Sequence, residues 1–116
     1  MWEVLEEIFK EIGLPYSRQG SYETESELPN SFFTFWNVAT NSISFYNDYE
    51  LKVDWEWAIY IYTNDPSILY SKLNEFIDLA KKKGFVCNGR GKDIASGIQN
   101  YFGRYVTITY SQIENK

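Results

Sequence analysis

The sequence has no histidine, and Cys87 is its only cysteine. Without histidine, Ser-His-Asp triads, Cys-His pairs and histidine-ligated metal sites are excluded. A lone thiol also excludes an internal disulfide and any CxxC motif. Carboxylates, Tyr, Lys and Arg are the groups left for catalysis, so the composition favours a protein that is not an enzyme. We therefore expect no catalytic residue, no bound metal and no cofactor.

Long hydrophobic runs are also missing. The longest apolar run, residues 57–62, has six residues, against about 20 for a membrane-spanning helix. The first residues carry no basic cluster of the kind that opens a signal peptide. We expect a protein of the cytoplasm or of a particle assembled there, with no membrane partner.

Aromatic residues, by contrast, are abundant. Four Trp, ten Tyr and eight Phe make up 19% of 116 residues. Intrinsically disordered chains have few aromatics, and this length is typical of one folded domain, here 1–116. A small core does not easily hide so many rings, so part of the aromatic surface is expected to contact a partner.

The net charge of −5 comes from one end of the chain. Residues 1–31 contain seven acidic and two basic residues, whereas the rest of the chain is neutral overall. This balance disfavours general or sequence-specific binding of nucleic acid.

Two segments have the pattern of helices. Apolar residues recur at helical spacing over 2–12, with glutamates between them, and Gly13 follows. A second helix is predicted to begin at Asp65-Pro66 and to end at Lys81-Lys82-Lys83, before Gly84. Residues 15–30 between the first helix and the strands are polar, and we expect a long loop or arm with at most a short strand near 19–24.

The remaining segments predict strands. Residues 31–37 and 42–46 are expected to pair as a hairpin around 39–41. Residues 49–63 alternate strictly, and their odd positions from Leu51 to Ile61 are all apolar, which predicts one core-facing row. The order α-β-β-β-α-β-β is completed by a short strand at 85–87, a turn at 88–92, a segment at 93–102 that is irregular or a short strand, a strand at 104–112 and a frayed tail at 113–116. The predicted class is α+β, a mainly antiparallel four- to five-stranded sheet packed with two helices.

Two motifs suggest chemistry only superficially. Asp54 and Glu56 stand two apart on one strand face, at a spacing suitable for an acid/base pair, but no apolar neighbour would separate their pKa values. The spacing of Gly84 and Gly89 is that of a phosphate loop, yet Arg90-Gly91 replaces Lys-Ser/Thr, and the segment follows a helix. We predict neither catalysis nor nucleotide binding.

Candidate interface residues are of three kinds. Tyrosines on the later half of the long strand suit a protein contact. A base-rich stretch without acids could form a patch, and alternating glutamates in the 16–30 loop, which we expect to be mobile until assembly, could contact that patch on a neighbouring subunit. The candidates are Tyr60 and Tyr62; Lys81, Lys82, Lys83, Arg90 and Lys92; and Glu23, Glu25 and Glu27.

The segments SFFTFWN (31–37), DWEWAIYIYTNDP (54–66), AKKKGF (80–85) and YFGRYVTITY (101–110) resemble tail-completion proteins. These are the tail-terminator class of long-tailed phages and of prophages in Gram-positive bacteria. The resemblance implies a non-enzymatic virion protein that forms a homo-oligomeric ring at the head-proximal end of the tail tube. It implies contacts with other tail proteins and with the head connector, in a virion assembled in the host cytoplasm. It transfers no catalytic residues.

The alternative is a small cytosolic binding module, of the inhibitor or immunity type, with an acidic N-terminal surface. A carboxylate-based enzyme is a third possibility that the motifs above disfavour.

Overall fold

The computed structural model describes residues 2–18, 29–44, 50–98 and 100–115, with the backbone alone for 42–44, 50–51 and 113–115. Its elements, in chain order, are helix α1 (Trp2–Ile12), strands β1 (Tyr16–Arg18), β2 (Ser31–Ser44) and β3 (Glu50–Thr63), helix α2 (Pro66–Lys82), and strands β4 (Val86–Cys87), β5 (Lys92–Ile94) and β6 (Phe102–Asn115).

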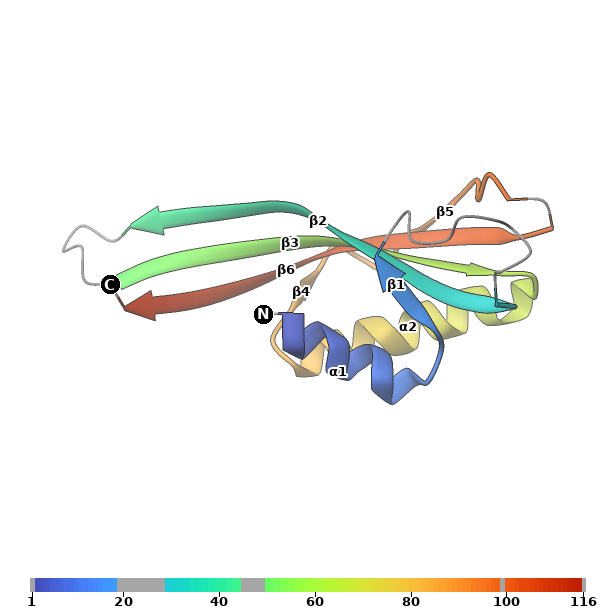
Figure 1. Ribbon diagram of the computed structural model, residues 1–116, viewed down its shortest axis with the longest axis horizontal. Helices are drawn as coiled ribbons and strands as arrows, with labels where there is room; N and C mark the ends of the chain where they lie inside the picture. The colour runs from blue at the N-terminus through green and yellow to red at the C-terminus, as the bar shows by residue number, and fades with distance from the viewer. Residues whose placement is uncertain (1, 19–28, 45–49, 99, 116) are drawn as a thin grey trace.

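The strands form one six-stranded sheet in the order β1-β2-β3-β6-β4, with β5 also paired to β6. Every pair is antiparallel except β1 with β2, which is parallel. Both helices cover the same face of the sheet (Figure 1). The predicted α+β class is confirmed, but the sheet is mixed and has more strands than the four or five expected.

The two helices form where the pattern predicted them. Helix α1 buries Leu5, Ile8 and Phe9 completely and ends at Gly13, whose φ of 86° suits glycine. In α2, the Asp65 carboxylate caps the first turn by accepting a 3.0 Å hydrogen bond from the Ser67 backbone N–H. The core therefore lies between these helices and the sheet.

Strand β2 corrects the predicted hairpin. Residues 31–44 form one strand, and the expected turn at 39–41 is instead paired to β3. The register shifts by one residue between Asn37 and Ala39, and the Asn37 side chain donates hydrogen bonds to the backbone oxygens of Ala39 and Glu56. A β-bulge places an extra residue, here Val38, without ending the strand. The turn-forming composition of 39–41 therefore marks a bulge, not a reversal.

Strand β3 confirms the core-facing row. Val53, Trp57, Ile59 and Ile61 are buried on the helix side, and Trp55 packs at the margin of the core, while the Leu51 side chain lies outside the described part. The opposite face is also partly covered, because Ala58 and Tyr62 are buried there.

Three further boundaries differ from the prediction. Tyr16–Arg18, inside the expected loop, form strand β1, while the strand predicted near 19–24 lies outside the described residues. Lys92–Ile94 form β5, so the start of segment 93–102 is the short strand of the two alternatives, and it begins at Lys92, inside the predicted turn. Strand β6 continues to Asn115 on β3, so residues 113–115 are not a frayed tail. In each case pairing with a long neighbouring strand overrides weak local preference.

The sheet is much longer than the helical layer. The molecule measures 54 × 27 × 23 Å, and β2, β3 and β6 project past the helices (Figure 1). We call this projection the arm and define it by the rows that begin at the last β4 pair and continue outward: residues 39–44 of β2, 50–56 of β3 and 109–115 of β6.

Candidate self-association surface

The acidic pair of β3 lies on an open surface. Asp54 accepts a 2.6 Å hydrogen bond from the Ser111 hydroxyl, and Lys52 Nζ is 3.8 Å from the same carboxylate oxygen. In the described parts of the chain, no three Cys, Asp or Glu side chains are grouped as metal ligands, and no helix is long and apolar enough to cross a membrane.

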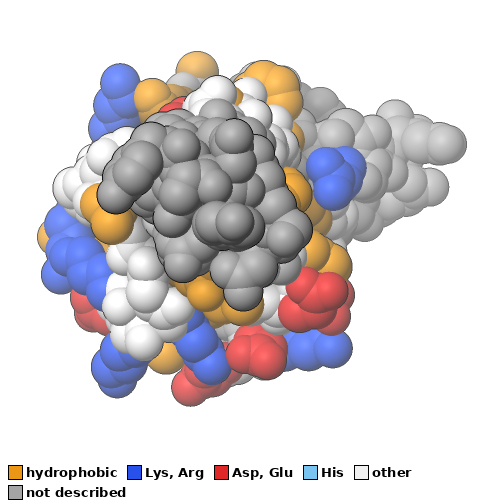
Figure 2. All heavy atoms as spheres, turned by 90° about the vertical axis from the view of Figure 1, so that its left-hand side faces the viewer, with side chains coloured by type: hydrophobic (Ala, Val, Ile, Leu, Met, Phe, Trp, Pro, Cys, Tyr) orange, Lys and Arg blue, Asp and Glu red, His pale blue; other side chains and the backbone are white. Residues whose placement is uncertain are grey.

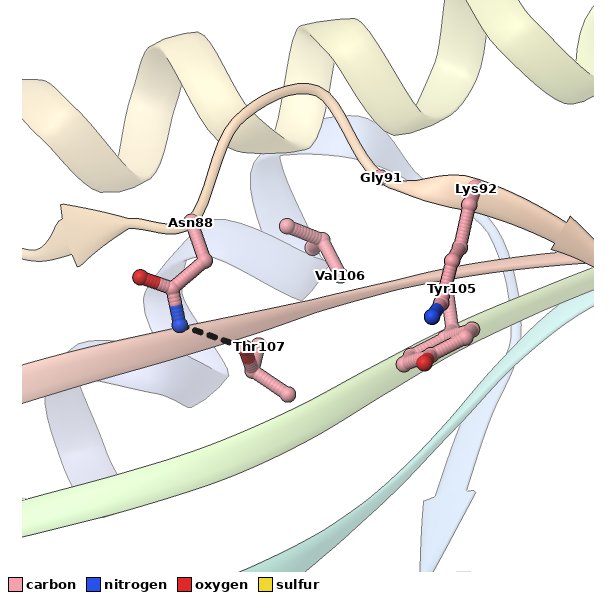
Figure 3. A pocket seen from close by; sticks show the side chains of 6 residues that line it. All are labelled: Asn88, Gly91, Lys92, Tyr105, Val106 and Thr107. Atoms are coloured by element: carbon pink, nitrogen blue, oxygen red, sulfur yellow. Dashed lines mark hydrogen bonds between the residues drawn. The ribbon is translucent and has the colours of Figure 1, made fainter.

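A pocket of about 270 Å³ lies where the chain between β4 and β5 arches away from β6. The Asn88 amide donates a 2.6 Å hydrogen bond to the Thr107 hydroxyl on its floor, and Lys92 lies beside the Tyr105 ring (Figure 3). At Gly91 the arch returns to β6 so closely that a Cβ there would lie 2.5 Å from the Tyr105 carbonyl oxygen, and the absence of a side chain permits this approach. These side chains already contact one another, so the pocket is a product of the arch and carries no chemistry of its own.

The base-rich stretch is not a patch of unpaired charge. Arg90 bonds Asp78 at 2.7 Å, which raises the pKa of the guanidinium and lowers that of the carboxyl. Lys83 lies 3.1 Å from Glu7 of α1, and Lys92 sits 5.4 Å from the Tyr105 ring centre. Lys81 and Lys82 are exposed in the last turn of α2, where they suit the helix dipole. Much of this positive charge therefore makes contacts within the subunit.

The expected acidic contact cannot be placed, because Glu23, Glu25 and Glu27 lie outside the described residues. In the view along the arm, most acidic and basic side chains lie in the lower part, on the helix side of the sheet (Figure 2).

The two candidate tyrosines have different environments. Tyr62 is only 9% exposed, and its ring lies 5.5 Å from that of Phe32 and 6.2 Å from that of Tyr60. Burial, and secondarily Tyr60, raises the pKa of Tyr62. Tyr60 is half-buried and stacks on Tyr105 at 5.4 Å. Tyr62 is thus a packing residue, and Tyr60 is the one of the two that reaches the surface.

Four large apolar side chains of the described sheet are exposed; one, Phe102, lies at the start of β6, and the other three lie at two different edges. Trp36 and Val38 on β2 are 48% and 45% exposed, and Val86 on β4 is 68% exposed. Strand order puts β2 and β4 on opposite sides of β3 and β6. Sequence reasoning missed all three residues. The sequence placed Trp36 in a strand but did not indicate which face of the sheet it lies on. Val86 is exposed because β4 is an edge strand, and only the topology shows this.

The arm has two open edges. Within the described residues, β1 pairs with β2 only as far as Phe35, and β4 pairs with β6 only as far as Thr109. Beyond these points both strands pair with β3 alone among the described residues, so within that part of the chain the N–H and C=O groups on one side of each backbone have no strand partner. The exposed apolar residues stand at the base of these edges.

Comparison with known protein-family models and with curated proteins finds no match to this sequence.

Proposed function

We propose that the protein is a non-enzymatic structural subunit of the tail-completion type, which forms a ring at the end of a phage tail tube. Its copies would associate through two unlike surfaces, which we call a head-to-tail contact between subunits. The observation that carries this proposal is the pair of unlike apolar edges on one sheet, Trp36 with Val38 on one side and Val86 on the other. A contact between unlike surfaces repeats from copy to copy and closes into a ring when the rotation permits.

The resemblance to tail-completion proteins supports the same function. Its four segments correspond to the start of β2, the second half of β3 with the α2 cap, the end of α2, and the larger part of β6. They are therefore the structural frame of the sheet and its helix. The alternative of an inhibitor-type module gains no specific support. On α1, Glu6 pairs with Lys10 and Glu7 with Lys83, and the acidic residues of the loop lie outside the described part.

Mixing two edge variants tests the head-to-tail contact. Trp36→Lys damages one edge and Val86→Lys the other, and each variant alone should remain monomeric in sedimentation velocity. Each still holds one intact edge, and these edges are complementary, so an equimolar mixture should form a one-to-one dimer. Ser71→Lys adds the same charge on the exposed side of α2 and should assemble like the wild type. Monomers in the mixture, with an assembling wild type, would contradict a head-to-tail contact.

The assignment to phage tails has its own test. The gene should lie among head and tail genes, and tails produced without the protein should lack a defined end in electron micrographs. Tails of normal length and normal head attachment in its absence would contradict the assignment, whatever the assembly state of the isolated protein.

A further inference from the structure

The charge pattern of the arm is the reverse of that usually found in soluble sheets. Edge strands normally carry charged residues, above all lysine, or proline, which prevent pairing with other chains. Strand β2 has no charged residue, proline or glycine among its 14 residues, although it is an edge. Strand β6 has none of these between Tyr105 and Ile113, and its charges are Arg104 and Glu114.

The charges of the arm are instead on its central strand. Residues 50–56 of β3 read ELKVDWE, so four of the seven are charged. Because β3 is hydrogen-bonded on both sides, charge there protects no edge. Apart from Glu114 of β6, the two strands that need protective charge in the arm lack it, whereas the central strand, which needs none, is charged.

The two open edges also match in length and direction. Beyond the bulge, β2 is regular over the six residues Ala39–Ser44, and β6 continues past β4 over the six residues Tyr110–Asn115. Both strands are antiparallel to β3 and hence parallel to each other (Figure 1). Copies related by the rotation of a ring keep this direction, so β2 of one copy meets β6 of the next in parallel.

The apolar residues at the base of the edges fall into the same register. Val86 pairs with Thr109, Thr109 pairs with Glu56, and Glu56 pairs with Ala39, next to Val38. A neighbouring β2 placed on the β6 edge just beyond Thr109 therefore brings its Val38 to Val86. The backbone pairing and the apolar contact belong to one surface.

We infer that the arm is a strand-pairing surface for a second copy of this chain: residues 39–44 of one subunit add in parallel along residues 110–115 of the next. Ala39 lies level with Ser111, so that the side chains of both copies keep the same sheet faces and the sheet continues across the contact. This inference rests on the proposed head-to-tail assembly and names the backbone contact that makes it. A two-fold pairing of β2 with β2 would use one edge and leave the β6 edge open. The matched lengths, and the fact that Glu114 is the one charged residue of the two segments, favour the contact that uses both.

Site-specific cross-linking tests the pairing. In a Cys87→Ser background, which removes the only native thiol, Asn41→Cys and Ser111→Cys place one cysteine on each edge. Both positions are exposed, and both pair with Asp54 from opposite sides, so they lie on the same sheet face. With a short bis-maleimide, a mixture of the two variants should give a cross-linked dimer, and neither variant alone should give one. Ala39→Cys, level with Ser111 in the inferred register, replaces Asn41→Cys in a second mixture, so that the two mixtures also cover a register shifted by two residues.

The controls separate the alternatives. Ser71→Cys mixed with Asn41→Cys should give no dimer. A dimer from Asn41→Cys alone would mean two-fold pairing and would overturn the inference. No dimer in either mixture, while the wild type still assembles, would overturn strand pairing and leave head-to-tail assembly standing.

A charge placed on the edge gives an independent readout. Asn41→Lys introduces a lysine into the β2 edge and should weaken self-association by at least about tenfold, because an edge lysine opposes the addition of a second strand. The thermal midpoint of the monomer should stay unchanged, and Ser71→Lys should weaken nothing. Wild-type association of Asn41→Lys would overturn the inference.

Discussion

At the residue scale, the aromatic side chains of this protein fall into two groups, buried and exposed. Phe9, Phe33 and Phe76 form a mutually packed set with ring centres 5.2–5.6 Å apart. Trp36 projects from the same sheet and is half exposed. Composition alone predicted the surplus of rings, but not which ring belongs to which group, because that depends on strand register and on what covers each face.

Trp57 and Trp36 provide a matched comparison of buried and exposed rings. Trp57 is 4% exposed and lies against Trp2 and Phe35, so Trp57→Ala should cost about 3–5 kcal/mol of unfolding free energy. Trp36→Ala should cost less than about 1 kcal/mol in urea titrations of the monomer. Equal losses for both variants would contradict the placement of β3.

The Cys87 thiol should react slowly in the folded protein. It is half-buried, with its Sγ 4.0 Å from the Ile77 carbonyl oxygen, and burial raises its pKa. Because the thiolate is the reactive form, alkylation by iodoacetamide at pH 8 should be slower than for the same protein in urea, after correction for the effect of urea on free cysteine. The same rate in both states would show that the β4 side of α2 is open.

At the element scale, the helices and the alternation of β3 could be predicted because the decisive signals are local. Caps, periodicity and a stop residue occur within one segment of sequence. The continuity of β2 could not be predicted in this way, because residues 39–41 are extended only through their pairing with β3. Strands β1 and β5 likewise depend on pairing with strands that are distant in the sequence, so local signals do not predict them. The same holds for the candidate surface. The excess of aromatic residues could be predicted from the sequence, whereas the positions of the two edges could be found only from the strand order.

The cap of α2 should make stability depend on pH in the acid range. Hydrogen bonds from the side chain and backbone of Ser67 lower the pKa of Asp65. Stability from this carboxylate is therefore present above the ordinary aspartate pKa and is lost as the pH falls through the lowered value. At pH 7 the thermal midpoint of Asp65→Ala should lie below that of the wild type. The difference between the two midpoints should shrink as the pH approaches 2. A constant difference across this range would contradict the cap.

The arch between β4 and β5 allows a second matched comparison. Gly89 and Gly91 both have positive φ, 73° and 83°, but a Cβ meets nothing within 4 Å at Gly89, whereas at Gly91 it would lie 2.5 Å from the Tyr105 oxygen. Gly89→Ala should cost about 1–2 kcal/mol for the backbone conformation alone. Gly91→Ala should cost clearly more in chemical denaturation. Equal costs would mean that the arch does not lie against β6.

At the scale of the whole molecule, the helices cover only part of the sheet. The core is complete between α1, α2 and the middle of β2, β3 and β6, so the subunit can fold as a monomer. The arm adds sheet without adding helix, and its unlike edges suit repetition of the same contact from copy to copy. A folded body with an uncovered sheet extension is what a ring subunit needs.

The acidic loop offers a separate prediction at this scale. Glu23, Glu25 and Glu27 carry much of the N-terminal negative charge, and we expect them to contact the base-rich stretch of a neighbouring subunit. Since Arg90 and Lys83 already bond Asp78 and Glu7, this contact should be secondary to the sheet edges. Changing all three glutamates to lysine should leave the monomer's thermal midpoint unchanged and weaken assembly at low salt more than at high salt. Assembly of wild-type strength at low salt would contradict it.

Self-association of the unmodified protein tests the central claim most directly. Multi-angle light scattering over a concentration series should show the 13.7 kDa monomer at low concentration. As concentration rises, the mass should reach a plateau at a fixed multiple of that value, because a ring is closed. Continuous growth without a plateau would mean an open filament, and a mass of one subunit at every concentration would contradict the account.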